Sequence, residues 1–101
     1  MTDINTEAPA AVVTVRVPSQ LRSLTEGAGE VIVPPGTVRD IIAALEAAHP
    51  GLASRLLDQE GALRRFVNVF VADEDVRFLD GLDTVVTGGQ TVSVVPAVAG
   101  G

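Results

Sequence analysis

The most reactive group that this sequence offers is the carboxylate of its last residue, Gly101, which follows a second glycine, Gly100. Glycine has no side chain to block close approach and accepts backbone angles that other residues avoid. Such an end can enter a narrow site on another protein, where joining to a nucleotide turns the carboxylate into a mixed anhydride. A sulfur nucleophile can then displace the nucleotide and leave a nucleophilic thiocarboxylate. We therefore expect the chemistry at Gly101, against the alternative that the chain simply ends on flexible residues.

The residues before the two glycines form a slim tail. The six residues from Pro96 to Gly101 extend roughly 20 Å when stretched. We expect this tail to thread a channel on a partner and to contact it through Gly100, Ala99, Val98, Ala97 and Pro96. We therefore expect three parts in the chain: a disordered leader at 1–11, a folded domain at 12–95 and a flexible tail at 96–101.

Length, composition and charge limit the classes of protein that remain. A chain of 101 residues is long enough for one small domain. It has no cysteine, which excludes a disulfide framework and fits the cytoplasm. Its net charge of −6 argues against nucleic acid as a partner, and no apolar run reaches the length of a membrane span. All seven basic residues are arginine, so the chain offers no lysine amine of its own for conjugation.

Outside the tail, the sequence shows no catalytic or metal-binding constellation. The single histidine, His49, precedes Pro50 and is expected to end a helix rather than to act as a base. The acidic run 73–75 lacks the ligand spacing of a calcium loop and is expected to be a solvated turn. The glycine pairs are not followed by the Lys-Ser/Thr start of a phosphate-binding helix. We expect a protein that binds no cofactor or metal and is not an enzyme by itself.

Hydrophobic periodicity predicts one main helix and several short strands. Thr37 is a good helix N-cap, Asp40 stands at the third helical position, and apolar residues follow at helical spacing, so a helix is expected over 38–48. Alternating valines and turn residues predict strands over 13–17, 30–33, 66–71, 76–78 and 91–95. Loops or turns are expected over 19–28, 58–65 and 79–86, and the last of these should contain a single helical turn. A short turn that caps the core is expected over 52–57.

One helix cannot cover both faces of a sheet, so the economical arrangement is an α+β roll with a mixed sheet wrapped on one face of the helix. The valine faces of the strands should then meet the apolar helix residues Val38, Ile41, Ile42 and Leu45. The other sheet face should stay open and hold Thr14, Arg16, Asn68, Phe70 and Ser93.

The open face is where we expect a partner to dock beside the tail, with Phe70 and Asn68 as contacts. Phe70 is the candidate apolar anchor, because aromatic side chains dominate interface energetics. The equally weighted alternative is that Phe70 packs under the loop 58–65. Arg65 and Arg77 are expected either to pair with acids of a partner or to be simply solvated.

The element order, the valine-rich core and the ending Val94-Val95-Pro96-Ala97-Val98-Ala99-Gly100-Gly101 resemble the ubiquitin-like sulfur carriers of the β-grasp fold. That family includes the small subunit of molybdopterin synthase and the thiamine-pathway carrier. The likeness covers about residues 13–101, is strongest to the actinobacterial carriers of cysteine biosynthesis, and rests most specifically on 65–69 and 73–78. Gly89-Gln90 stands where such carriers often have Gly-Asp, a departure expected to affect only a turn.

The resemblance implies partners that supply the chemistry this chain lacks. An E1-like, ATP-dependent activating enzyme would adenylate Gly101, and sulfur transfer would then give the thiocarboxylate. In the cysteine branch, the acceptor would be a pyridoxal-phosphate (PLP)-dependent cysteine synthase that uses activated serine, and a zinc peptidase would release cysteine from Gly101. ATP, PLP and zinc would belong to these partners, and the free chain is expected to be a monomer.

Several functions stay open at this point. The same carrier chemistry would serve molybdopterin, thiamine or a sulfur-containing secondary metabolite made by another sulfur-transfer enzyme. A different class of function is a ubiquitin-like modifier that forms isopeptide bonds with lysines of other proteins. A third is a plain interaction module, whose activity would survive loss of Gly100 and Gly101.

Overall fold

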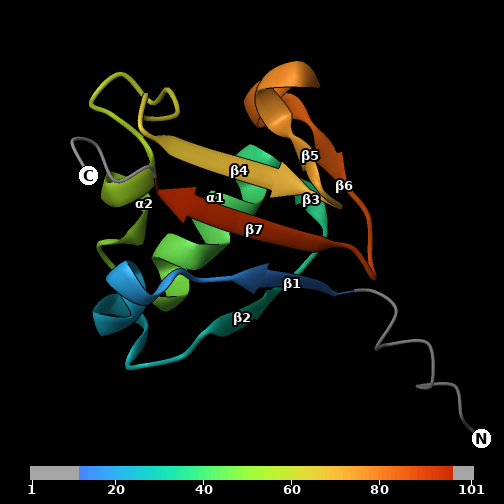
Figure 1. Ribbon diagram of the computed structural model, residues 1–101. Coiled ribbons are helices and arrows are strands. Elements are labelled where there is room, and N and C mark those ends of the chain that lie inside the picture. The colour runs from blue at the N-terminus through green and yellow to red at the C-terminus, as the bar shows by residue number, and fades with distance from the viewer. Residues whose placement is uncertain (1–11, 97–101) are drawn as a thin grey trace, which may run out of the picture.

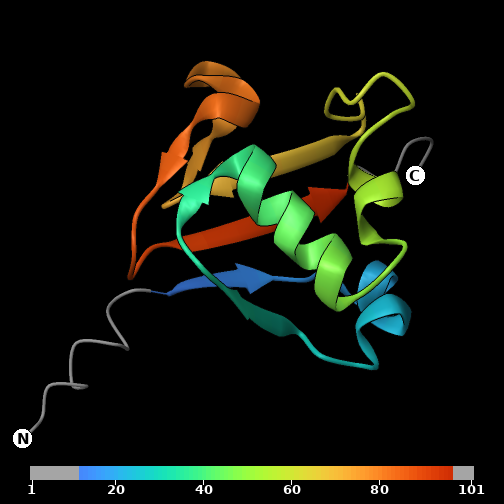
Figure 2. The same ribbon diagram turned by 180° about the vertical axis from the view of Figure 1, so that it is seen from behind.

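The computed structural model describes residues 12–96, which form a mixed sheet with a helix packed across one face (Figures 1 and 2). The strand order is β2-β1-β7-β4-β5, with β1 and β7 parallel and the other neighbours antiparallel. The predicted α+β roll on one main helix is therefore confirmed. The strands are β1 (Val13–Arg16), β2 (Glu30–Val33), β4 (Val67–Val71), β5 (Glu74–Asp75) and β7 (Thr91–Pro96). The predicted leader 1–11 lies outside the described residues.

The remaining elements connect and cover the sheet. Helix α1 (Val38–Ala48) crosses one face, and the short helix α2 (Leu52–Leu56) follows it (Figure 2). A second, two-stranded sheet pairs β3 (Gly36–Thr37) with β6 (Val85–Val86). Three 3-10 helices complete the described residues: η2 (Ser19–Thr25), η3 (Val76–Phe78) and η4 (Gly81–Asp83).

The core lies between α1 and the sheet and is built from aliphatic side chains. Alternate residues of a strand point to opposite faces, so the odd-numbered valines of β1 and β4 are buried while their neighbours are not. The predicted helix residues Val38, Ile41, Ile42 and Leu45 are all buried against them, together with Leu52 and Leu56 of α2. Each buried side chain of this size contributes about 1.5–3 kcal/mol, so this contact dominates the stability of the fold.

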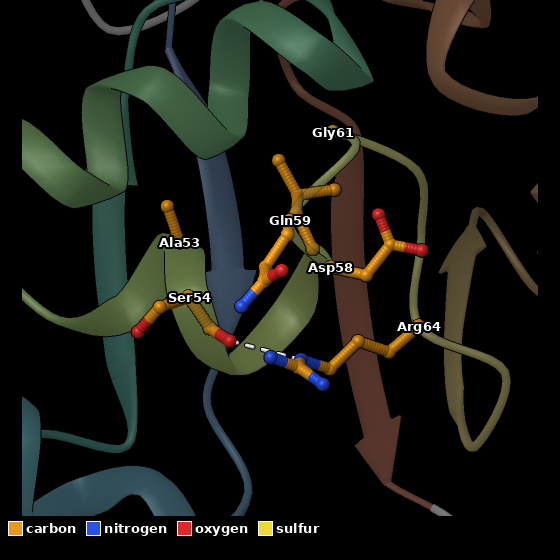
Figure 3. Close-up of a pocket in the computed structure, with 7 residues that line it drawn as sticks. Ala53, Ser54, Asp58, Gln59, Gly61 and Arg64 are labelled. Atoms are coloured by element: carbon orange, nitrogen blue, oxygen red, sulfur yellow. Dashed lines mark hydrogen bonds between the residues drawn. The ribbon is translucent and has the colours of Figure 1, made fainter.

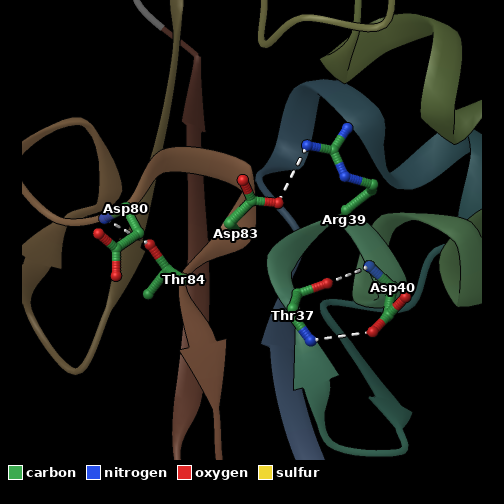
Figure 4. A network of polar contacts seen from close by, with 6 residues as sticks. All are labelled: Thr37, Arg39, Asp40, Asp80, Asp83 and Thr84. Atoms are coloured by element: carbon green, nitrogen blue, oxygen red, sulfur yellow. Dashed lines mark hydrogen bonds and ion pairs between the residues drawn. The ribbon is translucent and has the colours of Figure 1, made fainter.

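Helix α1 starts at the cap that the sequence predicts. The Thr37 hydroxyl accepts a hydrogen bond from the Asp40 backbone N–H at 3.1 Å, and the Asp40 carboxylate accepts one from the Thr37 N–H at 3.1 Å (Figure 4). Two of the helix's unpaired amide groups are thus satisfied. Arg39 pairs with Asp83 of η4 at 3.2 Å and ties the start of the helix to the segment before β6 (Figure 4).

Helix α2 is fixed by a side chain of α1. The Glu46 carboxylate accepts hydrogen bonds from the backbone N–H of Gly51, at 3.1 and 3.2 Å, and of Ala53, at 2.9 Å. These amides are orphan donors at the N-terminus of the short helix, where a negative charge is favourable. The short turn expected over 52–57 is therefore a capped helix that buries Leu52 and Leu56 in the core.

Two predicted segments have a different structure. Residues 19–25, predicted as part of a loop, form η2, because Leu21 and Thr25 are buried and fix the turns between them. Residues 76–78, predicted as a strand, form η3, and the strand that pairs with β4 is Glu74–Asp75. An alternation of two puts Val76 and Phe78 on one face of a strand, whereas the tighter turn of a 3-10 helix buries Val76 and exposes Phe78.

The turn between β4 and β5 holds a strained residue. Val71 pairs with Glu74, so the loop is Ala72-Asp73, and both residues have positive φ, 50° and 77°. This is the form of two-residue hairpin whose twist suits the strands, but a left-handed alanine costs roughly 1 kcal/mol.

We expect Ala72→Asn to raise the free energy of unfolding by about 0.5–1 kcal/mol, because asparagine tolerates this conformation better than alanine. Ala72→Val should lower it, since a β-branched side chain is disfavoured at positive φ. Urea denaturation of the three proteins measures both effects. Equal midpoints for the asparagine and valine variants would contradict this explanation.

Candidate functional site: the root of the tail and the open sheet face

The tail leaves the molecule from the centre of its sheet. Strand β7 lies between β1 and β4 and runs to Pro96, one residue further than predicted, where Pro96 pairs with Val67. The end of β7 lies beside the start of β4 and near α2 (Figure 1). Strand β1 pairs with β7 only as far as Ser93, whereas β4 pairs with it along its length to Pro96, so Pro96 is held by β4 and forms the root of the tail. The predicted site residues Ala97, Val98, Ala99, Gly100 and Gly101 lie outside the described residues.

Figure 1 shows the sheet from the side opposite α1. The side chains that the sequence predicts for this face alternate with the buried valines of the strands. Arg16 of β1 is exposed and lies near Glu30 at 4.0 Å, and its register partner in β7 is Ser93. Thr14, Asn68, Phe70 and Ser93 are half-buried. Val95, the register partner of Asn68, and Phe66, just before β4, are exposed at the root of the tail. The sequence placed Phe66 on the same strand face as Asn68 and Phe70 but did not name it as a contact, and it did not single out Val95.

Phe70 does not line the same depression as the loop 58–65. Its half-buried side chain lines an open depression with Phe78 and Leu79 and with the acidic residues of the β4–β5 hairpin. Phe70 is the register partner of Ser93, three residues before Pro96 along β7. At the usual rise of a strand it lies about 10 Å from the root of the tail.

Arg77 connects η3 to the start of β4. One guanidinium nitrogen donates to Asn68 Oδ1 at 2.9 Å, and the other donates to the backbone carbonyl of Arg64 at 2.8 Å. Arg77 is therefore engaged within the chain rather than simply solvated, and the Asn68 side chain oxygen already has a donor. The planar fork of an arginine suits this bridge, because its two terminal nitrogens each reach one acceptor, whereas a lysine has a single nitrogen on a flexible stem.

Replacing Arg77 with alanine should lower the free energy of unfolding by about 1 kcal/mol, since two exposed hydrogen bonds are lost. The Val67 amide, which also donates to the Arg64 carbonyl at 3.1 Å, should exchange its hydrogen about fivefold faster. Hydrogen exchange measures this, with the exposed Arg55→Ala on α2 as the matched control. Arg77→Lys should give an intermediate rate. If Arg55→Ala changed the Val67 amide as much, the bridge would not be the cause.

A shallow pocket lies between α2 and the loop 58–65 (Figure 3). The Arg64 Nε donates to the carbonyl of Ser54 at 2.9 Å, and the Asp58 carboxylate accepts from the amides of Glu60 and Ala62 at 2.8 and 3.0 Å. Both charged side chains thus hold the loop in place. The described residues around this pocket place no nucleophile beside a general base, so its geometry does not indicate catalysis.

His49 is the C-cap residue of α1, and its N–H donates to the Leu45 carbonyl at 2.7 Å, as expected of a helix end. Residues 12–96 hold no cluster of three or more His, Cys, Asp or Glu side chains placed for a metal ion. None of the helices in this range combines the length and apolar character required to span a bilayer.

Comparison with known proteins defines the class. A mixed sheet folded over one helix, with the last strand at its centre, is the β-grasp fold of ubiquitin-like proteins, and the predicted fold is confirmed. A crystal structure of an Amycolatopsis orientalis BexX/CysO complex contains a chain with a TM-score of 0.83 and 47% identity. The match covers 88% of the present chain and 99% of that one.

The family follows from the sequence matches. The family model described as "ThiS family" matches residues 15–101, and the chain belongs to this family. The sulfur carrier protein CysO of Mycobacterium tuberculosis is 46% identical over 91 residues, which cover 88% of this chain and 98% of the relative. Small archaeal modifier protein 3 of Haloferax volcanii is 45% identical over 65 residues, 64% of this chain and 70% of that protein. The predicted resemblance to sulfur carriers is confirmed, and the chain is a protein cosubstrate rather than an enzyme.

Proposed function

We propose that this chain carries sulfur as a thiocarboxylate on Gly101. The Gly101 carboxylate attacks the α-phosphorus of ATP and pyrophosphate leaves, which gives an acyl adenylate. Hydrosulfide then attacks the acyl carbon, and AMP leaves with the former carboxylate oxygen. The sulfur of the resulting thiocarboxylate is a good nucleophile at neutral pH and can be delivered to an acceptor.

The observation that carries this proposal is the match of the family model through residue 101, together with the central position of β7. An activating enzyme needs a folded domain that it can bind and a free C-terminus that can enter its active site. Pro96, held beside Val67 in the middle of the sheet, is the boundary between the two. In this proposal Gly101 is the reacting residue, docking uses Asn68 and Phe70, and the threaded segment comprises Pro96, Ala97, Val98, Ala99 and Gly100.

The partners follow from the same chemistry. An E1-like enzyme with ATP activates Gly101, and a sulfur-accepting synthase takes the sulfur. Identity to CysO favours cysteine as the product, with a PLP-dependent synthase that uses activated serine and a zinc peptidase that frees cysteine from Gly101. The CysO chain in the complex with BexX supports docking to a second protein. A secondary-metabolite enzyme is the alternative acceptor. ATP, PLP and zinc belong to these partners.

The test is the intact mass of the protein after incubation with the activating enzyme, ATP and sulfide. We expect the mass to change by the replacement of one oxygen with one sulfur, and to stay unchanged without ATP. Adding the PLP-dependent synthase and activated serine should then attach one cysteine to Gly101. An unchanged mass with every candidate activating enzyme would overturn the proposal.

A second candidate function is a protein modifier, which the similarity to the Haloferax modifier favours. The activated Gly101 would then be attacked by a lysine amine of another protein instead of by sulfide. Since this chain has no lysine, it would not form chains on itself. Conjugates of many sizes in cell extracts, absent when Gly101 is deleted, would support this function over sulfur transfer.

A further inference from the structure

All three phenylalanines of this chain lie outside its aliphatic core. Phe78 in η3 is 86% exposed, and Leu79 after it is 41% exposed. A single exposed apolar side chain needs no explanation, but these two share one open depression with Phe70 of β4. The Phe78 patch comprises these three side chains and the carboxylates that line the same depression, those of Asp73, Glu74 and Asp75.

The segment that carries Phe78 is held firmly. Val76 is fully buried in the core, and its carbonyl accepts from the Leu79 N–H at 2.9 Å. The Asp75 carboxylate caps η3 by accepting from the Arg77 N–H at 2.8 Å, and the Arg77 guanidinium is bound to β4 and its preceding loop. Phe78 is thus presented by an ordered turn, so a partner that binds it has less conformational freedom to remove.

The surroundings of the patch are acidic. From residue 73 to residue 83 the sequence has five carboxylates and one basic residue, Arg77, whose guanidinium donates to neutral acceptors of the chain. One of the five, Asp83, pairs with Arg39. The depression therefore combines two aromatic side chains with three acidic residues, and it complements an apolar segment that carries arginine or lysine.

One member of the patch, Phe70, lies near the root of the tail along the sheet. Phe70 belongs to the open face and is separated from Pro96 by three residues of β7 register, about 10 Å. The tail 96–101 spans roughly 20 Å when stretched. A protein that receives Gly101 therefore comes close enough to contact the patch at the same time.

We propose that the Phe78 patch is a docking surface for a basic, apolar segment of the activating enzyme. This inference rests on the proposed function, and it adds a contact that lies in the body of the chain, away from the reacting end. The patch supplies affinity and orientation only. Its loss should raise the concentration of carrier that the enzyme needs, without slowing the reaction of the bound carrier.

The decisive experiment compares Phe78→Ala with Ile32→Ala. Ile32 is also an exposed apolar residue, at 57%, but it lies on β2 at the opposite edge of the sheet. Calorimetric titration of the purified activating enzyme should give a Kd at least about tenfold higher for Phe78→Ala, and a change below about twofold for Ile32→Ala. In the thiocarboxylate assay, Phe78→Ala should raise KM and leave kcat unchanged. Equal Kd values for the two variants would overturn the proposal.

The acidic residues of the patch are tested separately by Asp73→Asn combined with Glu74→Gln, two exposed positions. The affinity of the unmodified chain should fall as salt rises from low to physiological ionic strength, and the double variant should show a weaker salt dependence. Identical salt dependence would show that these acidic residues do not face a basic partner and would overturn the charge complementarity.

The two proposals fail in different ways. If the unmodified chain binds the enzyme through Phe78 but its mass never changes, the patch is correct and the sulfur carrier function is wrong. If its mass changes and Phe78→Ala binds as tightly as the unmodified chain, only the patch is wrong. If the unmodified chain does not bind the enzyme at all, both are wrong.

Discussion

Adding one alanine after Gly101 should lower the rate of thiocarboxylate formation by at least about 100-fold. The extra residue moves the reacting carboxylate by roughly 3.5 Å and brings a methyl group into a site shaped for glycine. Misplacing a reacting group by far less than this is enough for such a loss. Deletion of Gly101 displaces the terminal carboxylate in the opposite direction, and we expect it to lower the rate by a similar factor. Intact mass under single-turnover conditions, with the activating enzyme in excess, measures both variants.

The matched control is an alanine inserted between Ala10 and Ala11, which lengthens the chain equally but outside the family match at 15–101. This control should react at the unmodified rate. Both end variants should also keep the stability of the unmodified protein, since they alter no residue of the core. An extended tail that reacted as fast as the natural one would mean that the position of the terminal carboxylate does not matter, which the proposed mechanism cannot accommodate.

Replacing Leu45 with alanine should lower the free energy of unfolding by about 3.5 kcal/mol, the middle of the range for a buried leucine. Leu45 is 2% exposed and sits on α1 between the helix and the valines of the sheet. The deletion removes apolar contacts and leaves a cavity that the surrounding side chains fill only in part. A small domain has about 5–15 kcal/mol in total, so the midpoint of urea denaturation should shift strongly.

Leu45→Met is the matched control, because it keeps the volume and should cost less than about 1.5 kcal/mol. Folded Leu45→Ala protein should still accept sulfur, since Leu45 lies on the face of the sheet away from the docking surface. A loss below about 1 kcal/mol for the alanine variant would indicate that α1 is not packed as described. If the Leu45→Ala variant were fully folded and still failed to accept sulfur, packing in the core would influence the reaction at the tail.

Local sequence signals predicted α1 and four of the sheet strands. The cap formed by Thr37 and Asp40 and the stop at His49-Pro50-Gly51 define both ends of the helix, and the predicted bounds agree with the structure. Each signal acts between residues at most a few positions apart, where backbone geometry decides the interaction. For the same reason the alternating valines of β1 and β4 predicted which side chains enter the core.

The pairing of the two short strands β3 and β6 was not predicted. The β3–β6 pair joins Gly36 to Val86, and neither dipeptide strand has a pattern of its own. The 3-10 helix η3 was taken for a strand because Val76-Arg77-Phe78 fits an alternation of two. Only the buried position of Val76 and the bonds of Arg77 to Asn68 and Arg64 decide that Phe78 points to solvent.

The sequence by itself determined the family of this protein and, in the proposed function, the residue at which it reacts, Gly101. In that proposal the terminal carboxylate needs no tertiary structure of its own to react, because the activation comes from another protein. The tertiary structure decided where the proposed docking surface lies. The central position of β7, the open face beside Pro96 and the acidic aromatic patch around Phe78 all depend on contacts between segments far apart in the chain, which no local pattern encodes.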